Sequence, residues 1–265
     1  MIKQVASSLN KKIYFLSDFH LGAPDHARSL QREKIIIQFL DQVKGDAAEI
    51  FLLGDMFDFW YEYRKVVPKG FVRLLGKLAE LSDSGIRLHF FPGNHDMWVK
   101  DYFKDELNMS MYTAPTAFER NGKKFWVAHG DGLGPGDHGY KRLKKLFRNP
   151  VAKWLFGIFP PMMGMGLANF LSRRSRAKTG TSEEKFLGAD KEWLMIYCRE
   201  ILAKEHFDYL VFGHRHLAID FNLGQGSRYI NLGDWINYYT YAEFDGEQMQ
   251  LRSFQGQEEK IIRHS

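Results

Sequence analysis

Short apolar runs alternate with stretches of helical periodicity along most of the chain. Continuous apolar or β-branched runs of buried-strand length predict strands at residues 12–17, 49–53, 88–91, 124–128, 209–212 and 228–232. Two further runs, 241–244 and 248–254, flank Asp245-Gly246, a dipeptide typical of a hairpin turn. Helical patterns cover residues 29–44, 70–82 and 183–204. Strand–helix repeats followed by β-rich structure predict an α/β fold, with a central sheet or a pair of sheets covered by helices.

Five of the predicted strands run directly into a polar cluster rich in Asp, His and Asn. The clusters are Asp18-Phe19-His20, Gly54-Asp55-Met56-Phe57-Asp58, Gly93-Asn94-His95-Asp96, His129-Gly130-Asp131 and Gly213-His214-Arg215-His216. Strand ends gather at one edge of an α/β sheet, where such folds place their sites. We therefore expect these side chains to form one site.

This mixture of side chains suits two divalent cations that share a ligand. A carboxylate can bridge two ions, and we assign that role to Asp55. Asp18 and His20 lie two residues apart, as do His214 and His216, so each pair can face one metal from an extended segment. No Cys takes part, which favours Mn, Mg or Fe over a structural zinc ion. One such cluster alone would be an ordinary turn, but five in series predict a metal site.

The five clusters resemble the calcineurin-like metallophosphoesterase superfamily, and the resemblance implies a four-layer αββα sandwich. It implies two divalent metal ions, with Mn expected and Mg, Fe or Zn as alternatives. One ion would be held by Asp18, His20 and His216, the other by Asn94, His129 and His214, and Asp55 would bridge them. His95 would lie next to the leaving oxygen, with Asp96 as its orienting partner. Asp58 would support the site without binding metal.

Within this superfamily the chain resembles the family of UDP-2,3-diacylglucosamine diphosphatases, which act in lipid A biosynthesis. The resemblance includes Gly54 to Trp60, His129 to Tyr140, residues 172–178 and Leu232-Gly233-Asp234-Trp235. It implies hydrolysis of a UDP-linked, doubly acylated glucosamine to UMP and a lipid sugar phosphate. Implied substrate contacts are Asn94, Tyr140, Arg176 and Lys185. The best-known members carry Arg where this chain has His95, and this difference leaves the identity of the substrate undetermined.

Residues 154–172 contain no charged side chain and are bordered by Lys and Arg on both sides. Pro160-Pro161 divides the segment, which predicts two short helices, or a helix and a loop, rather than a membrane span. An apolar patch with a basic rim is typical of contact with an anionic membrane, and it also suits an acyl-chain pocket. A buried helical hairpin or a contact between subunits is the alternative. We expect one domain over residues 1–265, with residues 136–185 as an inserted helical cap.

Composition adds limits to this picture. The chain has 265 residues, a formal net charge of +5 and one cysteine, Cys198. Its first ten residues lack the apolar core of a secretory signal, so we expect a cytoplasmic protein, peripheral on the inner face of the cell membrane. No nucleic-acid partner is expected, because the basic residues bracket an apolar run instead of alternating with stacking aromatics. A soluble phosphatase or phosphodiesterase acting on a nucleotide, or a scaffold without catalysis, are the competing functions. The oligomeric state stays open.

Overall fold

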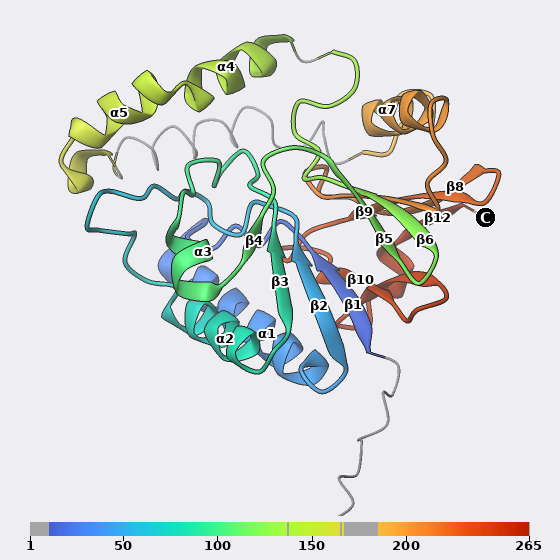
Figure 1. Cartoon of the computed structure of the whole chain (residues 1–265), viewed down its shortest axis with the longest axis horizontal. Helices are drawn as coiled ribbons and strands as arrows, with labels where there is room; N and C mark the ends of the chain where they lie inside the picture. Colours follow the sequence, from blue (N-terminus) through green and yellow to red (C-terminus); the bar gives the residue numbers. More distant parts are fainter. Residues whose placement is uncertain (1–10, 137, 165, 167–184, 265) are drawn as a thin grey trace, which may run out of the picture.

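The computed structural model of the chain describes residues 11–136, 138–164, 166 and 185–264. Within these residues the strands form two six-stranded sheets (Figure 1). The first has the order β11 (Met249–Ser253), β10 (Thr240–Phe244), β1 (Lys12–Leu16), β2 (Ala47–Leu52), β3 (Arg87–Phe90), β4 (Ser110–Met111). The second has the order β12 (Ile262–His264), β8 (Ala218–Gly224), β9 (Ser227–Leu232), β7 (Tyr209–Phe212), β6 (Lys123–Val127), β5 (Thr116–Arg120). Strands β1 to β4 are parallel, as are β6, β7 and β9, so their carboxyl ends point the same way within each sheet.

Helices cover the outer face of each sheet. Helices α1 (His26–Val43), α2 (Val72–Asp83) and α3 (Tyr102–Leu107) lie along the first sheet, and α7 (Trp193–Leu202) lies on the second (Figure 1). A short 3₁₀ helix, Glu258–Lys260, precedes β12. The expected four-layer αββα sandwich is confirmed.

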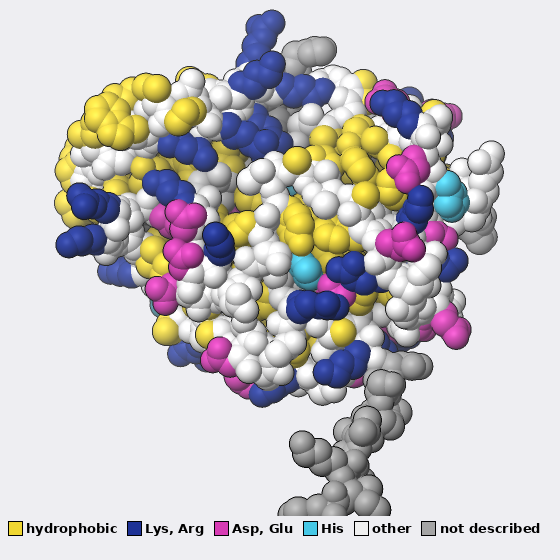
Figure 2. Space-filling view, in the orientation of Figure 1, with side chains coloured by type: hydrophobic (Ala, Val, Ile, Leu, Met, Phe, Trp, Pro, Cys, Tyr) yellow, Lys and Arg dark blue, Asp and Glu magenta, His cyan; other side chains and the backbone are white. Residues whose placement is uncertain are grey.

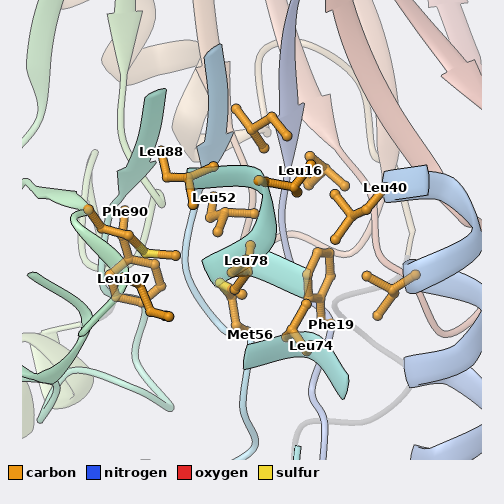
Figure 3. Close-up of a cluster of buried hydrophobic side chains, with 14 of the residues drawn as sticks. Leu16, Phe19, Leu40, Leu52, Met56, Leu74, Leu78, Leu88, Phe90 and Leu107 are labelled. Carbon is orange, nitrogen blue, oxygen red and sulfur yellow. The ribbon is translucent and has the colours of Figure 1, made fainter. Parts of the chain in front are cut away.

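Three hydrophobic clusters fill the three spaces between these layers. Alternate residues of one strand belong to different clusters: Ile13 and Phe15 of β1 face the second sheet, whereas Tyr14 and Leu16 face α1 and α2. Figure 3 shows the cluster beneath the helices, where Leu16 and Leu52 of the sheet meet Leu40, Leu74 and Leu78. The third cluster joins α7 to the second sheet and contains the buried Cys198. Burial on both faces explains why these strands read as continuous apolar runs.

One buried ionic cluster links the two sheets. Glu49 of β2 has a side chain that is 1% exposed, and its carboxylate accepts hydrogen bonds from His89 and Arg87 of the neighbouring β3, at 2.9 and 2.6 Å. Arg120 of β5, in the other sheet, binds the same carboxylate with two nitrogens, at 2.7 and 2.9 Å. Burial opposes ionisation, but His89 and the two arginines outweigh it and lower the pKa of Glu49 to about 2.

Helices α4 (His138–Arg148) and α5 (Pro150–Ile158) form a lobe beside the sandwich (Figure 1). Trp98 holds α4, because its indole Nε1 donates to the carbonyl of Phe147 at 2.7 Å. The Tyr61 hydroxyl donates to the carbonyl of Lys153 in α5 at 2.8 Å. Phe156 packs on both aromatic rings.

The break expected at the prolines is confirmed. Helix α5 ends at Ile158, and helical structure resumes at residues 161–164. No helix among the described residues has the length and apolar character that crossing a membrane requires.

The predicted helix 183–204 is wrong over its first part. Within the described residues the helix begins only at Trp193, and residues 185–192 are irregular or turn. Gly188 adopts a φ of +98°, a left-handed value that ends any helix running through it.

Candidate metal centre

All seven predicted metal ligands lie in loops that follow strands of the two sheets. Asp18 and His20 follow β1, Asp55 follows β2, and Asn94 follows β3. His129 follows β6, and the last two, His214 and His216, follow β7. Because β1 to β3 and β6 to β7 are parallel, these carboxyl ends meet at one edge of the sandwich.

The ligand atoms form three overlapping groups, each with its atoms within 4.8 Å of one another. The groups are Asp18 with His20 and His216, His20 with Asp55 and His95, and Asp55 with His129 and His214. Asp55 joins two sides of the cluster, since its Oδ2 lies 3.7 Å from His20 Nε2 and 3.5 Å from His129 Nε2. Asn94 contributes from the His129 side, where its Oδ1 is 3.2 Å from His129 Nε2.

The arrangement fits a pair of divalent cations. Asp18 Oδ1 is buried without a hydrogen-bond partner in the described residues, and it lies 3.6 Å from His20 Nε2 and 3.4 Å from His216 Nε2. The two imidazole nitrogens are themselves only 3.2 Å apart. Buried acceptor atoms that face one another cost free energy unless a positive charge lies between them. Nitrogen and oxygen donors without sulfur suit Mn, Mg, Fe or Zn.

The backbone at two glycines of the site lies very close to neighbouring side chains. A Cβ on Gly93 would lie 2.2 Å from Asp55 Oδ1, and one on Gly213 would lie 1.9 Å from Ser17 Oγ. Five of the predicted ligands have φ values in the left-handed region that non-glycine residues rarely adopt: Asp18 (57°), His20 (44°), Asp55 (53°), His214 (69°) and His216 (52°). Such strain persists only where the surrounding contacts enforce it, and it concentrates at functional sites.

Two histidines of the cluster, His20 and His129, have an unusual affinity for positive charge. Burial alone would lower the pKa of a histidine, but hydrogen bonds and nearby carboxylates raise the pKa of His20 and of His129 to about 10. Burial alone would raise the pKa of Asp18, but His216 and His20 lower it to about 2. Carboxylates that hold protons on buried imidazoles would hold metal cations in the same place.

Hydrogen bonds at the far ring nitrogen orient three of the histidines. His129 Nδ1 lies 2.6 Å from the carbonyl of Leu53, and His216 Nδ1 lies 3.0 Å from Asp234 Oδ2. His95 Nδ1 lies 2.9 Å from the carbonyl of Asp58. A nitrogen used in this way turns the other one toward the cluster and fixes the tautomer. The sequence reasoning did not assign Asp234 a role, although Asp234 also follows a strand, β9, at its carboxyl end.

The expectation that Asp96 orients His95 is wrong. The Asp96 carboxylate accepts from the backbone N–H of Gly93 at 2.7 Å and of Met56 at 2.9 Å. It thereby ties the loop after β3 to the loop after β2. Burial and the nearby Asp55 raise the pKa of Asp96 to about 7. The His95 imidazole contacts Asp58 instead, and the carboxylate of Asp58 also lies 3.8 Å from His20 Nδ1.

The remaining predicted substrate contacts, Lys185, Tyr140 and Arg176, stay predictions. Lys185 is exposed and lines neither of the two cavities described next. Tyr140 belongs to α4, but its side chain lies outside the described residues, as does Arg176 entirely.

Two cavities adjoin the cluster, one at His129 and one at Asp58. The first, which we call the basic cavity, has a volume of about 730 Å³. One wall is α4 with Lys141, Arg142, Lys144, Lys145 and Arg148, and the others are residues 112–115 and 128–133. Lys144 ion-pairs with Asp131 at 2.5 Å, and burial lowers the pKa of Lys144 in spite of this partner.

The second, which we call the apolar cavity, has a volume of about 710 Å³. Its lining is mainly apolar, with Leu21, Leu30, Phe59, Val66, Phe71 and Met162. Outside it, α5 presents exposed apolar side chains, among them Trp154 (65% exposed) and Ile158 (61%). Figure 2 shows these apolar side chains gathered at the α5 end of the lobe, with Lys and Arg side chains beside them.

The family model for calcineurin-like phosphoesterases matches residues 11–218. A UDP-2,3-diacylglucosamine hydrolase of Porphyromonas gingivalis is 40% identical over 262 residues, which cover 94% of this chain and all of that protein. Proteins of the same name from Ectopseudomonas mendocina and Shewanella putrefaciens are 29% and 27% identical, and the matches cover 92% and 90% of this chain and 98% and 95% of theirs.

Proposed function

The chain belongs to the calcineurin-like phosphoesterase family and is a metal-dependent phosphoesterase, and from this premise we propose that it cleaves UDP-2,3-diacylglucosamine to UMP and a lipid sugar phosphate. The observation that carries the proposal is the position of the histidine cluster between a basic cavity and an apolar cavity. A substrate with a nucleotide at one end of a diphosphate and acyl chains at the other matches both sides.

The basic cavity suits the nucleotide half. Arg142, Lys145 and Arg148 line it and form no ion pair with another described residue, so their charges remain available for an anionic ligand. The opposite wall contains Tyr112 and Pro115, which offer apolar surface for a flat base.

The apolar cavity and the underside of the lobe suit the acyl chains. Pro161 and Met162 of the lobe line the cavity together with Phe59 and Phe71 of the sandwich. Burial of acyl methylenes gains about 0.8 kcal/mol each, so even a short stretch of chain would bind well. We propose that residues 136–185 serve as a cap that encloses the lipid half.

The ligand assignment follows the geometry of the cluster. Asp18, His20 and His216 would hold one ion, Asn94, His129 and His214 the other, and Asp55 would contact both. These residues would hold two divalent ions, for which we propose Mn, and such ions would lower the pKa of a water molecule and neutralise charge on the phosphoryl oxygens. The Asp58 carbonyl holds His95 through Nδ1, so the remaining ring nitrogen is directed to the substrate side, where it can donate a proton to the leaving oxygen.

The outer face of α5 supports a second part of the proposal, contact with an anionic membrane at its cytoplasmic face. Val151, Trp154 and Ile158 are all more than 60% exposed, and the basic residues of α4 lie next to them in the chain. An apolar helix face with a basic neighbour binds anionic lipid surfaces. Binding there would bring the cap to the membrane that holds a diacylated substrate.

The test is incubation of the purified protein with UDP-2,3-diacylglucosamine and Mn²⁺, with UMP release followed by chromatography. We expect UMP as the nucleotide product, and much faster turnover than with bis-p-nitrophenyl phosphate or UDP-glucose. Lys145→Glu should slow the lipid reaction, while Lys204→Glu, the same charge change on an exposed residue just after α7, should not. Faster cleavage of soluble esters would replace the proposal with a soluble phosphodiesterase.

A further inference from the structure

The loop that carries His214 and His216 is held from the side by a buried ion pair. Arg215, between the two histidines, is 5% exposed, and its Nε donates to Glu192 Oε1 at 2.9 Å and Oε2 at 3.1 Å. Glu192 is itself 2% exposed. The guanidinium also lies over the ring of Trp193, 4.2 Å from its centroid. We call this arrangement the Glu192–Arg215 clamp.

The position of Glu192 at the start of α7 indicates that its side chain serves to bind Arg215. Glu192 is the N-cap residue of α7, where a carboxylate ordinarily accepts a hydrogen bond from the helix backbone. Its side chain makes no such bond and reaches Arg215 instead. The first turn of α7 is therefore attached to the metal-binding loop rather than capped.

The start of α7 also supports the loop that follows His129. A Cβ on Gly134 would lie 2.4 Å from the carbonyl oxygen of Trp193, so this loop packs directly on the helix backbone. A Cβ on Gly130 would lie 3.2 Å from Leu194 and 3.4 Å from the Cβ of His214. One short segment, residues 192–194, thus contacts the loops of two of the three ligands proposed for one metal.

The metal ion proposed on the other side of Asp55 does not depend on residues 192–194 in the same way. His216 has its own hydrogen-bond partner, Asp234, at 3.0 Å, and His20 lies in a different loop. His214 and His216 both have left-handed φ values, 69° and 52°, and the loop of His214 shares with that of His129 a direct contact with residues 192–194. Strained backbone holds its position only when neighbouring contacts enforce it.

We propose that Glu192 and Arg215 are positioning residues that keep His214 and His129 in place and so set the affinity of the metal ion on that side. The inference rests on the ligand assignment made for the proposed function. It extends that assignment to a pair that touches neither substrate nor metal, at the point where the chain returns from the cap to α7. Groups that orient metal ligands typically contribute 10- to 100-fold in metal affinity.

The test uses the double variant Glu192→Gln/Arg215→Met, which removes both charges and leaves neither unpaired. Titration of the metal-free protein with Mn²⁺, followed by electron paramagnetic resonance, measures both affinities and the coupling of the two ions. We expect one ion bound as in wild type and the second bound about 10- to 100-fold more weakly, with loss of the coupled signal. A matched control, Asp220→Asn/Arg228→Met, removes an Arg–Asp pair of β8 and β9 and should leave both affinities unchanged.

The outcomes separate the clamp from the proposed function. Wild-type affinity for both ions in a folded double variant overturns the clamp alone. A wild-type protein that binds no Mn²⁺ pair overturns the ligand assignment, and the clamp with it. Arg215→Lys keeps the charge with a single contact, so it should fall between wild type and the double variant. If Arg215→Lys matches wild type at both sites, the clamp is again overturned, even if the double variant does not fold.

Discussion

Trp98→Phe should detach the α4–α5 lobe without unfolding the sandwich. Trp98 is 7% exposed, and its indole N–H satisfies the carbonyl of Phe147, in the last turn of α4, where carbonyls lack partners within the helix. Phenylalanine keeps most of the aromatic packing but leaves this acceptor without its donor. Losing this partly buried hydrogen bond costs about 0.5–1.5 kcal/mol, which corresponds to roughly a 2- to 13-fold larger open population of the lobe.

Hydrogen exchange measured by mass spectrometry checks this prediction. Amides of α4 and α5 should exchange faster in Trp98→Phe by that factor, while those of β1 and β2 keep their protection. Turnover of the diacylated substrate should fall, and hydrolysis of bis-p-nitrophenyl phosphate should not. Trp126→Phe, in β6 on the far sheet, serves as the control and should leave α4 and α5 unchanged. Unchanged exchange in the lobe of Trp98→Phe, with faster exchange throughout the sandwich, would refute the reasoning.

Three further changes probe the site and the fold. Asp55→Asn should lose at least one of two bound metal ions, measured by plasma mass spectrometry, together with nearly all activity; retention of both ions would exclude a shared ligand. His95→Asn should keep both ions and lower kcat by about 10²- to 10⁴-fold, as expected for loss of a proton donor; loss of metal would make His95 a ligand instead. The third change is Glu49→Gln. The pKa of Glu49 is lowered from 4.5 to about 2, so its ionisation stabilises the fold above pH 4.5, and this stability is lost as the pH falls from 4.5 toward 2. The difference in unfolding free energy between wild type and Glu49→Gln, from urea denaturation, should therefore shrink by roughly 3 kcal/mol across that range; a constant difference would show that the cluster does not stabilise the ionised form.

The strands that the sequence revealed are those buried on both faces. β1, β2 and β7 lie between two hydrophobic clusters, so most of their positions are apolar and the run is easily recognised. β5 alternates between half-buried and exposed positions at a sheet edge, and β4 and β12 span only a few residues. Such strands are fixed by pairing with neighbours rather than by their own composition. The helical periodicity before Trp193 was overridden by the left-handed Gly188.

The proposed ligands could be found in the sequence because each directly follows a buried strand. The groups that orient them were harder to find. The carbonyl of Leu53, which contacts His129, is a backbone atom and has no signal in the sequence. The role that the family resemblance implied for Asp96 was wrong, because the side chains of Asp96 and His95 point to different partners in this loop. In the sequence, Arg215 occupies the variable position between His214 and His216. Only the fold shows that Arg215 contacts Glu192.

The central claim is that two divalent ions lie on the two sides of Asp55. Crystals of the protein soaked in Mn²⁺ and measured on both sides of the manganese absorption edge test it most directly. We predict two anomalous peaks, one among Asp18, His20 and His216 and one among Asn94, His129 and His214, with Asp55 in contact with both. A single peak, or two peaks that do not share Asp55, would contradict the account.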